Sequence, residues 1–369
     1  MRVMALLITV VLLATPGCTY LEESSEEEVD DTAEIQSLIQ GCTDPEAENY
    51  NSEAEEDDGS CVYANNPGSV SSIVNYTTLD GLLDNFVECI AVDINDNIWL
   101  GTSIGIQMFD GADWTTYTTI NGLVADNVKM IATANNGDIW IGTDFGVSQF
   151  DGVNWINYDN TNGLVSNQVK SIDADVNGGI WVGTNQGVSH FDGITWVSYS
   201  SDLHWSGVNA SSFDSNGDKW FASPLGGITH FDGTIFTSYD ESNGLLSQYV
   251  TDIVVDNHDN KWIGTSDGMS VLDASNASFT QHTMMYIMPP PDTLNPVVNI
   301  EIDSWGRIWT SIYVGYLAQG AVAYWDGSIW QDFDISDGLA GPNIKELAID
   351  SDNNIWIATS TGVSNIIIE

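Results

Sequence analysis

The sequence predicts an all-β fold, a seven-bladed β-propeller built from four-stranded antiparallel blades. The first observation is a recurring segment of about eleven residues, of which Gly137–Val147 is one copy. Repeats at such a spacing indicate stacked supersecondary units. The second observation is an apolar residue twelve positions before the Trp of every copy, such as Val128 before Trp140. The Trp residues of the copies are Trp99, Trp140, Trp181, Trp220, Trp262, Trp309 and Trp356, spaced 39 to 47 residues apart.

Each repeat divides into four predicted strands, named a to d in chain order. Strand a begins at the apolar residue, and strand b is the Ile-Trp-x-Gly-Thr segment. Strand c runs from Gly-Val to Phe-Asp-Gly, and strand d carries Trp-x-x-Tyr, as in Trp155 and Tyr158. Their Val, Ile and aromatic content, with turn residues between them, is typical of strands. Four antiparallel strands in about forty residues describe a propeller blade.

The third observation concerns the two ends of the repeat region, residues 70–369. The last copy stops after Ile366–Ile368 and lacks strand d. An orphan segment with strand-d spacing, Ile73-x-x-Tyr76 followed by Gly81-Leu82, stands before the first copy. We therefore expect the N-terminal strand to complete the last blade and close the ring, which leaves no free sheet edge at the seam.

The blade pattern, from its Asp-x-(Asn/Asp) turn through Ile-Trp-x-Gly-Thr to Phe-Asp-Gly, resembles the two-component regulator propeller repeat. In that family the repeats often form the periplasmic sensor part of hybrid histidine kinases. The resemblance implies the propeller fold and a tendency to bind ligands. The sequence departs from the hybrid kinases of that family in having no kinase or DNA-binding segment after the repeats, which leaves a role in signalling open.

Residues 1–18 have the features of a secretory signal. Arg2 precedes an apolar run, Met4–Ala14, that is too short to span a bilayer. Gly17-Cys18 resembles a bacterial lipoprotein cleavage site, which implies lipidation of Cys18; plain secretion is the alternative. Residues 19–40 are rich in Glu and Asp without apolar partners, so we expect a solvated, disordered tether.

Residues 41–63 contain Cys42 and Cys61, which in an exported chain predict a disulfide across a small acidic loop. Such a crosslink would stabilise the loop by about 3 kcal/mol. The stretch resembles a short cysteine-bracketed module of secreted bacterial proteins. Its oxygen ligands for a structural Ca²⁺ would come from Asp44, Asp57 and Asp58. A linker without metal is the alternative, and no other cofactor is expected.

The composition excludes one class of partner. With 53 Asp+Glu against 7 Lys+Arg, the formal charge is −46, so the basic face that nucleic-acid binding needs is lacking. So much negative charge favours a soluble monomer and an exterior location. We expect an outer-membrane lipoprotein or cell-surface protein, alternatively a secreted or periplasmic one. Contact with a membrane would be through the lipid anchor alone.

Three motifs that suggest chemistry have better structural interpretations. Ser103 lies in a Gly-x-Ser-x-Gly pattern, but the pattern falls on the b–c turn rather than on a strand-to-helix elbow. The acidic turns, such as the one starting at Asp93, are too short for a calcium loop and are expected to cap their own backbone. His190 and His230 occupy one repeat position without metal-binding spacing, and Cys89 is expected to be a buried free thiol.

The position after the strand-a apolar residue holds three of the few basic residues, Lys129, Lys170 and Lys345. They predict a weakly cationic collar at the channel mouth that would attract an anionic ligand, such as an acidic glycan or a carboxylate. Local pairing with carboxylates such as Glu88 and Glu346 is the alternative.

Departures from the repeat indicate a binding surface, since loops vary on a fixed scaffold. A long d–a connection contains Met284, Met285 and Tyr286, and the b–c turn at residues 311–319 is five residues longer than its counterparts. Strand alternation brings both to one face of the ring. The aromatic and histidine candidates there are His204, Trp205, Tyr286, Tyr313 and Tyr316. Packing of one insertion on the other is the alternative.

Together these features predict a non-enzymatic, exported, sensor-like propeller. Its partner would be a small molecule, a glycan or a protein, bound on the loop-rich face or at the channel mouth. One alternative is a propeller lyase acting on a polysaccharide or a lactone. A second is a structural or adhesive cell-surface protein.

Overall fold

The computed structural model describes residues 40–41, 56–57, 68–175, 177–200, 207–286 and 295–369. The chain divides into two compact units, residues 1–64 and 65–369. In the first unit two short strands, β1 (Gln40–Gly41) and β2 (Glu56–Asp57), pair in parallel. Within these ranges, no helix has the length and apolar character needed to cross a membrane.

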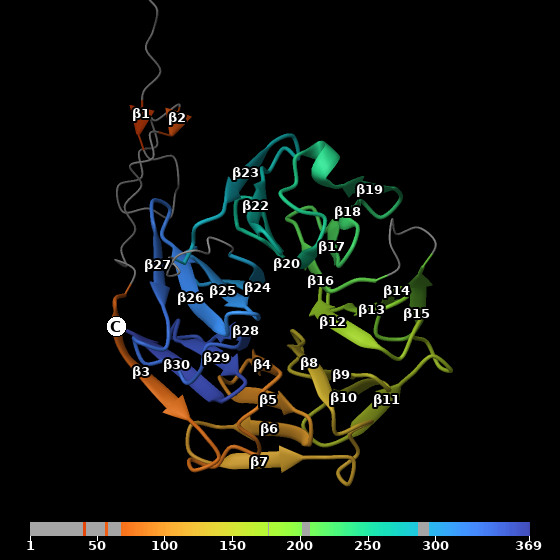
Figure 1. Ribbon diagram of the computed structural model, residues 1–369. Helices are drawn as coiled ribbons and strands as arrows, with labels where there is room; N and C mark the ends of the chain where they lie inside the picture. Colours follow the sequence, from red (N-terminus) through yellow and green to blue (C-terminus); the bar gives the residue numbers. More distant parts are fainter. Residues whose placement is uncertain (1–39, 42–55, 58–67, 176, 201–206, 287–294) are drawn as a thin grey trace, which may run out of the picture. The chain divides into compact units, whose positions relative to one another are not determined.

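The second unit is a ring of seven four-stranded antiparallel sheets (Figure 1). The first strands of successive blades contact one another around a full circle, which makes them the innermost strands. This architecture confirms the predicted fold class. Blades 1 to 3 comprise β4 (Cys89–Val92), β5 (Ile98–Thr102), β6 (Gly105–Phe109) and β7 (Trp114–Tyr117); β8 (Val128–Thr133), β9 (Ile139–Thr143), β10 (Gly146–Phe150) and β11 (Trp155–Tyr158); and β12 (Val169–Ala174), β13 (Ile180–Thr184), β14 (Gly187–Phe191) and β15 (Trp196–Tyr199).

The remaining blades follow the same order. A short 3₁₀ helix, η1 (Glu241–Asn243), lies in the connection between blades 4 and 5. Blades 4 to 7 comprise β16 (Ala210–Phe213), β17 (Lys219–Ser223), β18 (Gly227–Phe231) and β19 (Phe236–Tyr239); β20 (Val250–Val255), β21 (Lys261–Thr265), β22 (Gly268–Leu272) and β23 (Phe279–His282); β24 (Val297–Ile302), β25 (Ile308–Val314), β26 (Gln319–Trp325) and β27 (Trp330–Phe333); and β28 (Ile344–Ile349), β29 (Ile355–Thr359), β30 (Gly362–Ile368) and β3 (Val70–Tyr76).

The repeat Trp holds each blade together from strand b. All seven are buried, at 0 to 8% exposure, and Trp99 and Trp140 stack on the strand-d tyrosines Tyr117 and Tyr158. The outer strands are only half buried, because one of their faces meets solvent. The apolar core therefore lies between neighbouring blades rather than at the centre of the ring.

An acidic residue in the a–b turn orients the Trp in six blades. In blade 1, Asp93 accepts hydrogen bonds from the amides of Asn95 and Asn97, and its second oxygen accepts one from Trp99 Nε1 at 2.9 Å. This confirms the predicted capping of the turn. Blade 2 has Ala134 in place of this Asp and keeps the backbone turn. The equivalent acids are Asp175, Asp214, Asp256, Asp303 and Asp350.

The ring closes as the sequence predicts. β3 pairs antiparallel with β30, with Tyr76 opposite Val363, so the N-terminal strand is strand d of blade 7. The C-terminus consequently lies beside β3 (Figure 1). Arg307 of blade 6 adds a further contact, because its Nη1 donates to the Gly68 carbonyl just before β3.

Candidate functional site

The d–a connections and b–c turns form one face of the ring, which we call the loop face. Strands b and d both end there because strand direction alternates within each blade. Among the residues that the structure describes, nineteen large hydrophobic side chains are exposed, and eleven of them belong to this face. These eleven are Leu79, Phe86, Ile104, Ile120, Phe145, Leu225, Tyr249, Met284, Tyr316, Leu317 and Ile335.

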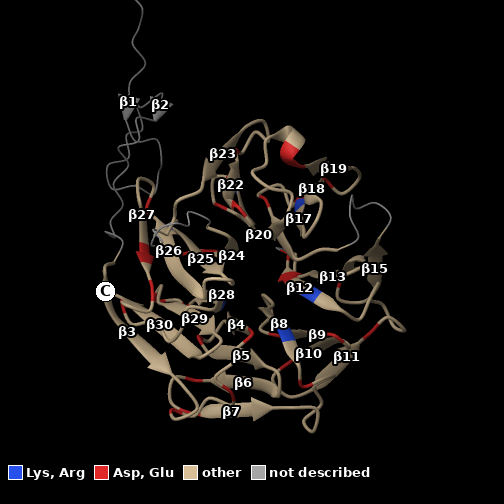
Figure 2. Ribbon diagram, viewed as in Figure 1, with Lys and Arg blue, Asp and Glu red and all other residues tan. Residues whose placement is uncertain are grey.

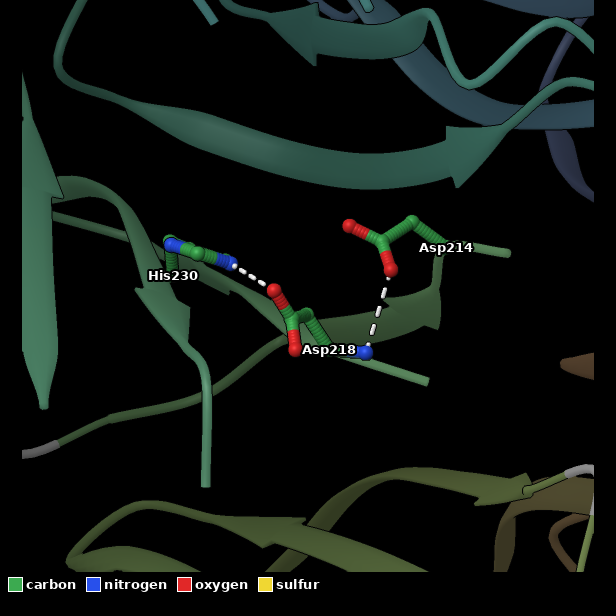
Figure 3. Close-up of side chains that lie close together, drawn as sticks. All are labelled: Asp214, Asp218 and His230. Carbon is green, nitrogen blue, oxygen red and sulfur yellow. Dashed lines mark hydrogen bonds and ion pairs between the residues drawn. The ribbon is translucent and has the colours of Figure 1, made fainter. Parts of the chain in front are cut away.

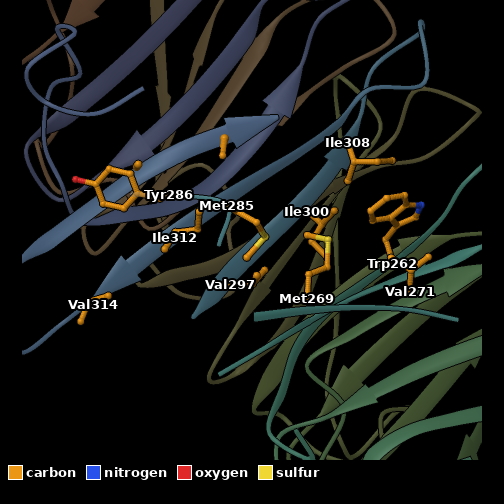
Figure 4. Packing of buried hydrophobic residues seen from close by; sticks show 12 residues of the cluster. Trp262, Met269, Val271, Met285, Tyr286, Val297, Ile300, Ile308, Ile312 and Val314 are labelled. Carbon is orange, nitrogen blue, oxygen red and sulfur yellow. The ribbon is translucent and has the colours of Figure 1, made fainter. Parts of the chain in front are cut away.

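The long d–a connection contributes less to this face than the sequence suggested. Met285 and Tyr286 are buried, at 1% and 7% exposure, and only Met284 is exposed, at 66%. The Tyr286 hydroxyl donates to Asp334 Oδ2 at 3.0 Å. The expectation that Tyr286 offers an exposed aromatic ring is therefore wrong, because its ring lies in the core between blades 5 and 6 (Figure 4).

The insertion in blade 6 forms strand rather than loop. β25 and β26 are longer than their counterparts and stay paired up to Val314 and Gln319. Only Gly315–Ala318 form the turn between them. Ile312 and Val314 are buried in the same cluster as Met285 and Tyr286 (Figure 4). The alternative that one insertion packs on the other is confirmed. Tyr313 is partly buried, and Tyr316 at the turn is 69% exposed.

The innermost strands enclose a central channel of about 450 Å³, lined by residues of all seven blades. Four carboxylates line it: Asp173 on β12, Asp252 on β20, Glu301 on β24 and Glu346 on β28. From the sequence, Glu346 was named only as a possible partner of the collar lysines, and the convergence of the four acids was not predicted. They lie two or four positions after the strand-a apolar residue, and positions two apart share one face of a strand. The sequence signal that could have identified them is the presence of acidic residues in inner strands that are otherwise largely apolar.

Three of the channel acids connect neighbouring blades. Asp173 accepts from Ser211 Oγ at 2.5 Å, Asp252 accepts from the Ile300 amide at 2.7 Å, and Glu346 accepts from the Ile90 amide at 2.7 Å. Each donor belongs to the next blade of the ring. These hydrogen bonds between blades help to hold neighbouring blades in register.

Burial, together with mutual repulsion, favours protons on these carboxylates. Removal from water, and to a smaller extent the charges of Asp252 and Asp173, raise the pKa of Glu301 to about 8. Burial likewise raises the pKa of Asp173 to about 7 and that of Glu346 well above its ordinary value. These charges affect one another because the four side chains share one enclosed space.

The three lysines of the predicted collar occupy equivalent positions, each at a β-bulge where β8, β12 and β28 shift register. Only Lys345 of the three lines the channel. Its Nζ lies 3.7 Å from Glu88 Oε2, which is the pairing given as the alternative. Figure 2 shows basic residues on β8 and β12. Binding of an anionic ligand by these lysines remains a prediction. The carboxylates that line the channel would repel such a ligand.

Asp214, Asp218 and His230 in blade 4 bring their possible ligand atoms within 4.8 Å of one another (Figure 3). His230 Nε2 lies 2.9 Å from Asp218 Oδ2, and the His230 ring stacks on Trp220. Asp214 already accepts from the Asp218 amide and from Trp220 Nε1. Since Asp214 makes the bonds that its counterparts make in other blades, we assign this group to the scaffold.

The remaining motifs are structural. Ser103 is exposed in the tight turn between β5 and β6, and no helix follows it. His190 stacks on Trp181 with ring centroids 4.3 Å apart, in parallel with His230 on Trp220. Cys89 is a buried free thiol, as predicted.

Several predicted residues lie outside the described part of the chain. They are Cys18, the tether, Cys42, Cys61, Asp44, Asp58, the side chain of Asp57, His204 and Trp205. Their roles in lipidation, crosslinking, calcium binding and ligand contact stay predictions.

Residues 81–103 and 338–361 match a family model described as two component regulator propeller. No curated protein matches the chain. Among solved structures, the chain is similar to the extracellular domain described as that of a hybrid two component system from B. thetaiotaomicron, at 21% identity and a TM-score of 0.67. That match covers 80% of this chain and 41% of the other, so this chain spans less than half of the domain it matches.

Two further similar structures belong to proteins with other roles. Streptogramin B lyase matches with 13% identity and a TM-score of 0.65, covering 80% of this chain and 97% of the lyase. PorZ, a surface component of the type-IX secretion system of Porphyromonas gingivalis, matches with 19% identity and a TM-score of 0.63, covering 79% and 47%. At these identities the likeness shows the fold alone. The two segments that match the two component regulator propeller model both lie in the seven-bladed propeller.

Proposed function

We propose that the protein is an exported, non-enzymatic binding protein that recognises a macromolecular partner through its loop face. The observation that carries the proposal is the concentration of exposed apolar side chains there. Leu79 and Ile120 are 95% and 94% exposed, and Phe145 is 65% exposed. Burial of such side chains against a partner would be favourable, and soluble proteins tend to keep exposed apolar groups where they make contacts.

The comparisons support export and a sensor-like role. Two of the similar structures are extracellular domains of bacterial signalling systems, and a third is a bacterial surface component. A signal sequence with lipidation at Cys18 would place the propeller outside the cytoplasm on a tether. The acidic composition is consistent with that location.

The lyase alternative has weaker support. Streptogramin B lyase shares the scaffold, but the channel lining described here consists of aliphatic, hydroxyl, amide and acidic side chains with Lys345 and no histidine. The described histidines 190 and 230 stack inside blades. We therefore propose binding rather than catalysis as the function of the propeller.

Two matched variants test the proposal. One replaces Leu79, Ile120 and Phe145 by Ser on the loop face, and the other replaces Val153, Ile194 and Ile235 by Ser in c–d turns of the opposite face. All six side chains are exposed. The free energy of unfolding of each variant should therefore differ from that of the parent by no more than about 1 kcal/mol. The readouts are retention of the purified protein on envelope fractions of the source cells and binding to a glycan array.

We expect the loop-face variant alone to lose binding, by about tenfold or more. Equal loss in both variants would indicate nonspecific hydrophobic adsorption. Unchanged binding in the loop-face variant would contradict the proposed surface. A substrate turned over by the purified protein would replace the proposal by the enzyme alternative.

A further inference from the structure

Blade 2 lacks a carboxylate that the other six blades have, and a cavity lies at that position. In those six blades the acid of the a–b turn accepts hydrogen bonds from two turn amides and from the repeat Trp Nε1, the last at 2.9 to 3.1 Å. Ala134 occupies this position in blade 2. Ala134 and Trp140 both line a cavity of about 280 Å³ between blades 2 and 3. The space that a carboxylate fills elsewhere in the ring is therefore open in blade 2.

The donors that hold the carboxylate in other blades are still present in blade 2. Trp140 is 2% exposed, and its Nε1 makes no hydrogen bond with a residue that the structure describes. Unlike Trp196 Nε1, this nitrogen is not enclosed away from solvent. The Asn136 amide also has no acceptor among the described residues, and the Asp138 amide donates to Asn136 Oδ1 at 3.1 Å. A buried indole N–H normally has an acceptor, so these donors indicate a site for one.

The rest of the lining suits a small molecule with a short apolar tail. Ile156, Ile180 and Phe191 contribute apolar surface, and Ile180 and Phe191 are 3% and 9% exposed. The volume lies just below the usual range of pockets for drug-sized ligands, so the cavity can hold only a few non-hydrogen atoms beyond a carboxylate. Contact of an alkyl tail with these three side chains would add the favourable burial of apolar surface.

Asp138 is the one charged side chain in the described lining of this cavity. Its Oδ2 accepts from Asn136 Nδ2 at 2.9 Å and from Gln149 Nε2 at 2.6 Å, and these donors offset part of its charge. Blade 4 shows that two carboxylates fit side by side at these positions. There Asp214 and Asp218, the counterparts of Ala134 and Asp138, lie in one group with oxygens within 4.8 Å. The charge of Asp138 therefore does not prevent a monoanion from binding beside it.

We propose that this cavity binds a small aliphatic monocarboxylic acid, whose carboxylate takes the place of the aspartate side chain that blade 2 lacks. The carboxylate accepts hydrogen bonds from Trp140 Nε1 and from the backbone amides of Asn136 and Asp138. The alkyl tail lies against the apolar side chains of the lining. The cavity is formed by a–b and c–d turns, on the face opposite the loop face, so this inference does not depend on the loop-face partner.

NMR spectroscopy of the ¹⁵N-labelled full-length protein tests the site through the indole N–H signal of Trp140, which is assigned by its loss in Trp140→Phe. The probe is sodium butyrate, and butyramide is its uncharged counterpart; NaCl keeps the ionic strength constant. The test variant Ala134→Asp supplies the carboxylate from the chain itself and fills the site. Ala112→Asp is the matched control, because Ala112 is exposed in a c–d turn of blade 1 outside the cavity.

We expect butyrate to shift the Trp140 signal of the parent and of Ala112→Asp with the same affinity. Butyrate should bind Ala134→Asp about tenfold or more weakly than the parent, and butyramide should bind the parent more weakly than butyrate by a similar factor, the size of one lost charge-assisted hydrogen bond. If Ala134→Asp does not fold, as judged by circular dichroism, Ala134→Asn, which fills the same space with an uncharged acceptor, replaces it with the same expectation.

Equal affinity for butyrate in the parent and the Ala134 variant overturns the proposal. Equal affinity of the parent for butyrate and butyramide overturns it as well, because the site would then not select a carboxylate. So does an unshifted Trp140 signal up to about 50 mM butyrate, a range that covers weak ligands. In that case solvent water alone satisfies the indole N–H.

Discussion

At the scale of single residues, the channel acids make the stability of the fold depend on pH. Their pKa values are raised in the folded protein, so the folded state holds more protons than the unfolded state between the ordinary pKa of a carboxyl and the raised one. Stability must then fall as the pH rises through that window. The sign is opposite to that of a carboxylate with a depressed pKa, such as Asp273 in an exposed turn.

The melting temperature should therefore decrease from about pH 5 to about pH 8.5, the interval that ends just above the raised values. Glu301→Gln should flatten this dependence, because it removes one titrating group without removing a hydrogen-bond acceptor in use. Differential scanning fluorimetry across the range measures both effects. A melting temperature that rises with pH throughout the interval would show that other groups dominate.

The Asp–Trp pairs act at the same scale, and Asp350 is a suitable example. It accepts from the Asp352 and Asn354 amides and from Trp356 Nε1. Asp350→Ala should lower the free energy of unfolding by about 2 kcal/mol, since Trp356 Nε1 and two turn amides lose their acceptor. Asp352→Ala, an exposed neighbour, should change it by less than about 0.5 kcal/mol. Urea unfolding measures both, and equal effects would contradict the assigned role.

At the scale of elements, the seam between β3 and β30 is the connection on which the ring depends. Ile73 of β3 packs against the buried cluster of blade 7, whereas its neighbour Ser72 is exposed. Ile73→Asp should therefore cost about 3 kcal/mol and Ser72→Asp much less. Chemical unfolding of the two variants makes the comparison. If Ile73→Asp were as stable as Ser72→Asp, blade 7 would not need β3 to remain folded.

Elements also show why sequence predicted some features and missed others. Strands, turns and ring closure repeat seven times, so one regular pattern predicts them. The buried position of Tyr286 depends on Ile312 and Val314 of the next blade, a contact between two insertions that no repeat defines. The channel acids come from four blades and differ in their position within strand a. Their convergence is visible only when the innermost strands form a circle.

At the scale of the whole molecule, charge is the dominant property. A formal charge of −46 means that folding brings like charges together. Salt screens such repulsion, so the melting temperature should rise when NaCl is increased from about 0.02 M to about 0.5 M. If the repulsion came only from the Asp and Glu residues of the N-terminal segment, salt should not raise the melting temperature of the propeller. Comparing the full chain with a protein that starts at residue 65 by the same measurement separates the two contributions.

The position of β3 has a consequence for the order of events during synthesis. Blades 1 to 6 each consist of strands that are consecutive in the chain, so each can form as soon as its own residues are available. Blade 7 joins residues 70–76 to residues 362–368. The first strand of the propeller must therefore wait, unpaired, until the last strand has been made. During that interval its exposed edge could pair with another chain, so cells that make this protein would benefit from a chaperone that shields residues 70–76.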